Sequence, residues 1–182
     1  MINAELLAQG RQHLEARAAA LGQMQFLDVV PRNFTFADIR RGVERDELNE
    51  WLNPLFIRNV NPPVIYRLAA NNQEGADRLR RAFADFEPQN GHRLARNNNI
   101  LDSSTIYVGS SRSICQRLRQ HLNTTAAATY ALKMGLWCPE ADYSVRVEVS
   151  GVQGDAGVLQ VQDIEDALWT RSRPMFGKFG AK

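Results

Sequence analysis

The chain has 182 residues, a formal net charge of +2 and 44% hydrophobic residues, values typical of a globular protein with one sizeable core. Its apolar runs are too short for a membrane-spanning helix, and the polar N-terminus does not resemble a secretory leader. We therefore expect a soluble, cytoplasmic protein without a membrane partner. Cys115 and Cys138 lack metal-ligand spacing, so we expect buried, reduced thiols.

Residues 1–58 are predicted to form a helical N-terminal extension. Apolar residues recur at helical spacing from Leu6 to Leu21 and again from Phe36 to Leu52. The Asn-Pro-Pro run at 61–63 then forces the backbone out of any helix, which places a domain boundary there and a second domain at 59–182. The extension is either a partner-binding arm or a continuation of the core, and its sequence does not decide between them.

The second domain alternates short β-branched runs with runs of helical period. Strands are expected at 64–70, 105–109 and 143–149, and the last of these alternates apolar and polar residues without a fault. Helices are expected at 75–87, 113–122, 125–137 and 163–173. This order predicts an α+β fold, a small three-stranded antiparallel sheet flanked by helices, with an insertion at about 71–103.

Five polar residues occupy a spaced pattern across these elements. Tyr66 ends the strand run Val-Ile-Tyr, and Tyr107 begins the strand run Tyr-Val-Gly. Arg117 follows ten residues after Tyr107 and His121 four residues later, one helical turn further on. Glu165 lies in the last predicted helix, directly after an isoleucine. Together these residues resemble the GIY-YIG nuclease family, and the resemblance extends over most of the second domain.

The resemblance implies a metal-dependent endonuclease that hydrolyses DNA phosphodiester bonds, in a restriction, phage-defence, mobile-element or repair setting. It implies that Glu165 binds Mg²⁺, with Mn²⁺ as a substitute, and that Arg117 neutralises a phosphate oxygen. One of Tyr66 and Tyr107 would act as general base and the other would orient it. His121 would position the attacking water or relay its proton.

Two departures from the family favour an alternative, a catalytically weak DNA-binding or partner-docking module that retains the nuclease fold. Gly177 stands where the family often carries asparagine, and the insertion separates the two tyrosines by 41 residues, from 66 to 107. Each residue also has an ordinary interpretation taken alone: tyrosines are common in strands, and Glu165 fits the acidic first turn of a helix. The joint spacing, rather than any single residue, supports the nuclease.

The composition also bears on partners. Of the 22 basic residues, three are lysine and 19 are arginine, whose planar fork suits phosphate, although codon bias in a GC-rich genome would give the same result. We assign no role to His13 or His92. A homodimer, or a partner protein bound through the N-terminal helices, is compatible with the sequence. We expect seven arginines either to contact a DNA backbone or to solubilise the surface. They are Arg78, Arg80, Arg81, Arg93, Arg96, Arg112 and Arg119.

Overall fold

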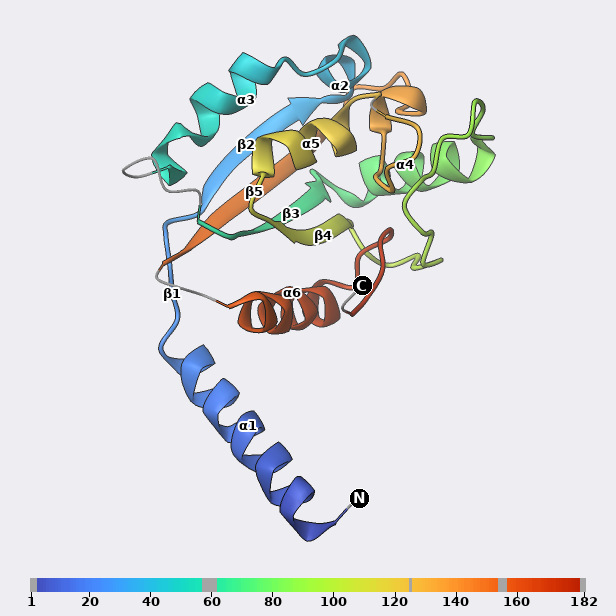
Figure 1. Ribbon diagram of the computed structural model, residues 1–182. Helices are drawn as coiled ribbons and strands as arrows, with labels where there is room; N and C mark the ends of the chain where they lie inside the picture. Colours follow the sequence, from blue (N-terminus) through green and yellow to red (C-terminus); the bar gives the residue numbers. More distant parts are fainter. Residues whose placement is uncertain (1–2, 57–61, 125, 154–156, 181–182) are drawn as a thin grey trace.

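The computed structural model describes residues 3–56, 62–124, 126–153 and 157–180, and these form an α+β fold around an open antiparallel sheet (Figure 1). The strands of the described residues are β1 (Gln25–Phe26), β2 (Val30–Thr35), β3 (Val64–Ala70), β4 (Thr105–Ser111) and β5 (Ser144–Gln153). The helices are α1 (Ala4–Gly22), α2 (Phe36–Arg41), α3 (Arg45–Leu52), α4 (Gln73–Asp85), α5 (Ile114–Leu122) and α6 (Val158–Ser172), with short 3-10 turns η1 (Asn53–Leu55) and η3 (Met134–Leu136).

The longest strand, β5, is the centre of the sheet. It pairs with β3 on one side and with both β1 and β2 on the other, and β3 pairs in turn with β4. Its residues Val145, Val147 and Val149 are fully buried, because alternate side chains of a strand point to the same face. The alternation predicted for this segment is thus confirmed.

Helices cover both faces of the sheet (Figure 1). On one side α2, α3, α4 and α5 pack over it, and their buried side chains, such as Leu48, Leu79 and Leu118, form the main core. On the other side lies α6, where Val161 packs with Ile65 of β3 in a smaller core. Among the described residues, no helix is both long and apolar enough to cross a membrane.

The prediction of three strands is wrong, because the described residues contain five. Strands β1 and β2 come from the segment predicted to be purely helical. The six residues of β2, Val-Pro-Arg-Asn-Phe-Thr, carry polar side chains and a proline, which a strand tolerates only at a sheet edge. Phe34 and Leu52 share the main core with residues of the second predicted domain. The predicted boundary near residue 58 lies outside the described residues.

The helix predicted at 125–137 is also wrong: residue 125 lies outside the described residues, and 126–137 form turns and the short η3. Side chains bind the backbone groups that a helix would pair internally. Lys133, fully buried, donates from Nζ to the carbonyl oxygens of Ala126 and Ala127, each at 2.8 Å. Leu132 N–H donates to a histidine ring, and the Tyr130 carbonyl accepts from an arginine.

The remaining predicted elements are confirmed with shifted ends. The helices predicted at 75–87 and 113–122 are α4 and α5, and the helix predicted from residue 163 begins five residues earlier, at Val158. The N-terminus of α4 is capped by Asn72, whose side chain accepts from the Gly75 N–H at 2.8 Å. Both cysteines are free thiols: Cys138 is buried and Cys115 half-buried.

Phe34→Ala should lower the free energy of unfolding by about 3–5 kcal/mol. The Phe34 side chain is 1% exposed and packs edge-on against Trp51, with the two ring centroids 5.9 Å apart. Phe26→Ala, in the neighbouring strand and 46% exposed, should cost less than about 1 kcal/mol. Urea unfolding followed by circular dichroism measures both values. Equal, small losses would mean that β2 is not part of the core.

Candidate active site

Two strands and one helix bring four of the predicted site residues into direct contact. The Tyr66 Oη of β3 lies 3.0 Å from His121 Nε2 of α5. Arg117, one turn earlier in α5, donates from Nε to the same oxygen at 3.3 Å and from Nη2 to Tyr107 Oη of β4 at 3.2 Å. The arginine is therefore held between two phenol oxygens.

The sheet register explains why the tyrosines meet. Tyr66 is opposite Gly109, and Tyr107, two residues before Gly109, is opposite Leu68 on the same face. The two tyrosine rings are stacked, with centroids 6.1 Å apart and planes 16° apart. A Cβ at position 109 would lie 2.6 Å from Tyr66 Oη, closer than any real contact. Glycine at this position lets the Tyr66 phenol lie across β4.

His121 is fully buried, and its two ring nitrogens have different partners. Nδ1 accepts from the Leu132 N–H at 3.3 Å. In the neutral ring this contact leaves the proton on Nε2, which then donates to Tyr66 Oη. The tautomer is thus assigned from the hydrogen-bond network.

Arg117 has further partners that fix its orientation. Its Nη1 donates to the Gln120 side-chain oxygen at 2.9 Å and to the Tyr130 carbonyl at 3.0 Å. Burial lowers the pKa of Arg117, but the nearby oxygens of Tyr66 and Tyr107 outweigh burial and raise the pKa above its ordinary value. The guanidinium therefore keeps its positive charge.

The phenol of Tyr66 behaves differently. Burial, followed by the electrostatic influence of Tyr107, raises its pKa well above the usual value of 10.0, while Arg117 acts in the opposite direction. Desolvation disfavours the charged phenolate more than the nearby guanidinium favours it. Tyr66 is consequently protonated at neutral pH in the protein alone.

Glu165 approaches this cluster from α6. Its Oε2 accepts from Ser110 Oγ at 2.5 Å, and Ser110 directly follows Gly109 in β4. The carboxylate is close enough to contribute to the raised pKa of Tyr66, after the larger effects of burial and Tyr107. Glu165 thus comes from the α6 side of the sheet, whereas His121 and Arg117 come from α5, and Glu165 is not among the residues that line the cavity beside Tyr107 and Arg117.

The described residues contain no group of three or more His, Cys, Asp or Glu side chains arranged to hold a metal ion. A single carboxylate is nevertheless compatible with Mg²⁺, which prefers oxygen ligands and keeps several waters or phosphate oxygens in its shell. Glu165, oriented by the Ser110 hydroxyl, offers such a ligand. One carboxylate beside a hydroxyl is thus compatible with a Mg²⁺ ion that takes its other ligands from water or substrate.

A cavity of about 450 Å³ opens beside Tyr107 and Arg117. We call it the groove. Its wall includes Arg96 from the insertion and Lys178 from the C-terminal loop. Tyr66 and His121 are buried behind it. The other lining residues are Leu94, Ala95, Tyr130 and Gly177.

Gly177, at the position where the family often carries asparagine, has a structural explanation. Its φ of +114° is strained for any other residue, and a Cβ there would lie 3.0 Å from the Tyr107 ring. Its N–H donates to the Arg96 carbonyl at 2.9 Å, which ties the C-terminal loop to the insertion. An asparagine here would strain the backbone and would require the Tyr107 ring to shift.

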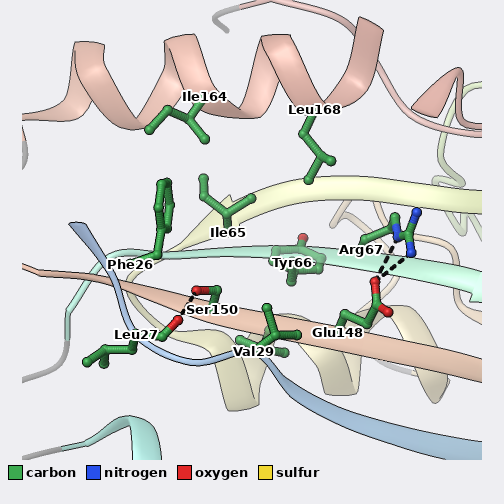
Figure 2. Close-up of a pocket in the computed structure, with 11 residues that line it drawn as sticks. Phe26, Leu27, Val29, Ile65, Tyr66, Arg67, Glu148, Ser150, Ile164 and Leu168 are labelled. Carbon is green, nitrogen blue, oxygen red and sulfur yellow. Dashed lines mark hydrogen bonds and ion pairs between the residues drawn. The ribbon is translucent and has the colours of Figure 1, made fainter. Parts of the chain in front are cut away.

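A second cavity, of about 440 Å³, lies between the sheet and α6 (Figure 2). Phe26, Ile65 and Ile164 point toward one another in it. Its charged residues, Arg67 and Glu148, form an ion pair at 2.7 Å. The ion pair neutralises the charge of Arg67, whereas the lining of the groove has three basic residues and no acidic one, so the groove is the better candidate for binding phosphate.

The arginines predicted to follow DNA have different surroundings. Arg96 lines the groove, and Arg93 lies 5.5 Å over the ring of Tyr130. Arg80 donates to the carbonyls of Ile100 and Leu101 and so stabilises the insertion. The others do not line the groove: Arg78 pairs with Glu74, Arg81 bonds the Asp77 carbonyl, Arg112 is exposed, and Arg119 is half-buried.

Sequence reasoning missed two groove residues. Lys178 is one of three lysines and follows a glycine, a pattern that signals a loop rather than a site. Tyr130 was assigned to a helix that does not form. Neither residue has a local pattern pointing to the groove, because segments distant in sequence form its wall.

No family model, no curated protein and no solved structure matches the chain.

The raised pKa of Tyr66 predicts a loss of stability in alkali. Above pH 10 the unfolded tyrosine ionises while the folded one keeps its proton, so stability present below pH 10 falls as pH rises, by up to about 1.4 kcal/mol per unit. Tyr66→Phe should flatten this slope, measured by urea unfolding between pH 9 and 11. Tyr130→Phe, at an exposed ring, serves as the control and should leave it unchanged. If the free energy of unfolding fell equally with pH in Tyr66→Phe and in the parent protein, the raised pKa of Tyr66 would be contradicted.

Proposed function

We propose that the protein is a Mg²⁺-dependent endonuclease of the GIY-YIG type that hydrolyses DNA phosphodiester bonds. The observation that carries the proposal is a charged guanidinium, Arg117, fixed by two tyrosine hydroxyls at the wall of a groove that also has Arg96 and Lys178. Three positive charges around one cavity suit a phosphate backbone. A restriction, defence, mobile-element or repair role is equally compatible with this chemistry.

Burial divides the roles among the four clustered residues. Tyr107 and Arg117 line the groove, so we assign them contact with the substrate: Arg117 neutralises a non-bridging phosphate oxygen, and the Tyr107 hydroxyl orients the attacking water. Tyr66 and His121 are at most 1% exposed and do not line it. They act as positioning residues, because their hydrogen bonds hold the Arg117 side chain in one orientation.

Glu165 is the proposed metal ligand. Mg²⁺ bound there would supply positive charge for the scissile phosphate and the leaving oxygen, and Mn²⁺ could replace it. Ser110 holds one carboxylate oxygen and so fixes the direction of the other. This hydrogen bond orients Glu165 without a second acidic ligand.

The alternative is a DNA-binding or partner-docking module with little activity. It is favoured by the lack of a multi-residue metal cluster in the described chain and by glycine at position 177. Such a module would keep the basic groove and bind DNA without cutting it. The experiments below separate the two functions.

Glu165→Gln and Arg117→Met should each lower cleavage of plasmid and linear duplex DNA at least about 100-fold, because each removes a charge that stabilises the transition state. Glutamine retains an oxygen that can accept from Ser110, so the fold should persist. Cleavage is measured in Mg²⁺, Mn²⁺ and EDTA, with circular dichroism as a folding check. Asp166→Asn, next to Glu165 in α6, is the matched control and should remain active. Binding without cleavage in every metal would establish the alternative module.

Arg96→Ala and Lys178→Ala should weaken DNA binding and each reduce the slope of log affinity against log salt by about 1, the effect of losing one phosphate contact. Arg78→Ala, on α4 and paired with Glu74, should leave the slope unchanged. Fluorescence anisotropy with a labelled duplex over a range of salt concentrations gives these slopes. A change in slope for Arg78→Ala alone would place the DNA on another face.

A further inference from the structure

The exposed apolar side chains of the described residues are concentrated around α1. Of ten exposed large hydrophobic residues, seven lie on α1 or where it joins the body. This set, which we call the arm patch, includes Leu14 at 67% exposure. Apolar side chains exposed along one helix and at its base mark an interaction site more often than single scattered residues do. The arm patch consists of Leu6, Leu7, Leu14, Phe26, Val29, Val158 and Leu159.

Helix α1 extends away from the rest of the molecule (Figure 1). None of its 19 residues is buried, and it is tied to the body near its C-terminal end by the ion pair of Arg17 with Asp163. An isolated helix of this length is marginally stable in water, since most helical stability comes from packing. Among the described residues only the C-terminal end of α1 is partly covered, so the rest of the helix would gain stability from a surface supplied by another molecule.

The leucines of α1 recur at an interval that makes a continuous seam. Leu7, Leu14 and Leu21 are seven residues apart, so they lie on nearly the same side of the helix. Gly10 and Ala18 lie between them on this side and are small. A Cβ at Gly10 would meet nothing within 4 Å, so this chain does not require glycine there. A small residue on a leucine seam lets a second helix approach closely.

We propose that α1 pairs with α1 of a second copy of this chain, antiparallel, about a two-fold axis near Leu14. Leu14 then packs on Leu14 of the second copy, and Leu7 packs on its Leu21, which is half-buried, so each leucine of the seam meets a leucine. A two-fold interface uses the same patch on both copies, which the equal spacing of the three leucines permits.

The ends of the helices support this arrangement. Helix α1 is about 28 Å long at 1.5 Å per residue, so in an antiparallel pair Leu6 and Leu7 reach the base of the other α1. The base carries Val158 and Leu159, and the Leu159 carbonyl accepts from Arg17 at 3.3 Å. The exposed leucines at the tip of one copy thus cover the exposed residues at the base of the other.

The charges on α1 are compatible with pairing to itself. The helix has two acidic residues, Glu5 and Glu15, and two arginines, Arg11 and Arg17, so two copies do not repel one another. Arg11 and Glu15 flank Leu14 and bond within one helix at 2.8 Å. In the antiparallel pair, Arg11 of each copy lies near Glu15 of the other. A helix without excess positive charge has little electrostatic attraction to the phosphates of DNA.

Sedimentation velocity from 1 to 200 µM tests the pairing with the full chain. The parent protein should form a dimer, and Leu14→Glu should weaken association about 100-fold, because it would bury two unpaired carboxylates at the axis. Leu101→Glu is the matched control, since Leu101 is 68% exposed and lies outside the arm patch. A monomer at every concentration, or equal dimerisation of parent and Leu14→Glu, would overturn the proposal. The sedimentation result does not depend on whether a variant retains nuclease activity.

Oxidative cross-linking tests the direction of the helices. In a Cys115→Ser background, Leu14→Cys should give a covalent dimer, because the two positions meet at the axis. Leu7→Cys should not, since in the antiparallel pair its two copies are about 20 Å apart at 1.5 Å per residue. Efficient cross-linking through Leu7→Cys would indicate parallel helices and contradict the antiparallel arrangement. Binding of DNA by α1 would appear instead as a lower affinity of Leu14→Glu for DNA without any dimer.

Discussion

The hydroxyl of Tyr66 is the contact on which the candidate site depends. A buried hydroxyl without partners costs about 1–3 kcal/mol, so the fold must supply hydrogen bonds to it. Here Nε of Arg117 and Nε2 of His121 both reach the same oxygen. The two hydrogen bonds to this oxygen hold α5 against β3, and they also orient the Arg117 side chain toward the groove. Stability and the orientation of the proposed phosphate-binding group therefore depend on the same contact.

The insertion between β3 and β4 contributes directly to the groove. Its α4 buries Leu79 and Phe83 in the main core, and its later part forms bridges from Leu94 to Ala131 and from Asn97 to Phe176. These bridges hold Arg96 at the groove wall. Three segments distant in sequence, namely the insertion, the loop before η3 and the C-terminal loop, thus form one surface with the start of α5.

The sequence predicted those parts of the fold in which local pattern and burial agree. β5 alternates valines with polar residues, and α5 presents Leu118 and Leu122 on one side, so both were recognised. β2 was missed because its exposure alternates but its sequence does not: the inward-facing set of Val30, Arg32 and Phe34 includes an arginine, and only Phe34 is fully buried. The segment around Lys133 has a helical pattern, but its backbone is bound by side chains from elsewhere, which no local pattern shows.

The contact between Tyr66 and Gly109 also constrains how this sequence can change over time. The phenol occupies the space that a side chain at position 109 would need, with only 2.6 Å from its oxygen to a Cβ. A larger residue at 109 is tolerable only after a smaller one has replaced Tyr66, and that first step would remove the hydrogen bonds to Arg117 and His121. Single substitutions at either position are therefore disfavoured. The two positions should vary as a pair among descendants of this sequence, or not vary at all.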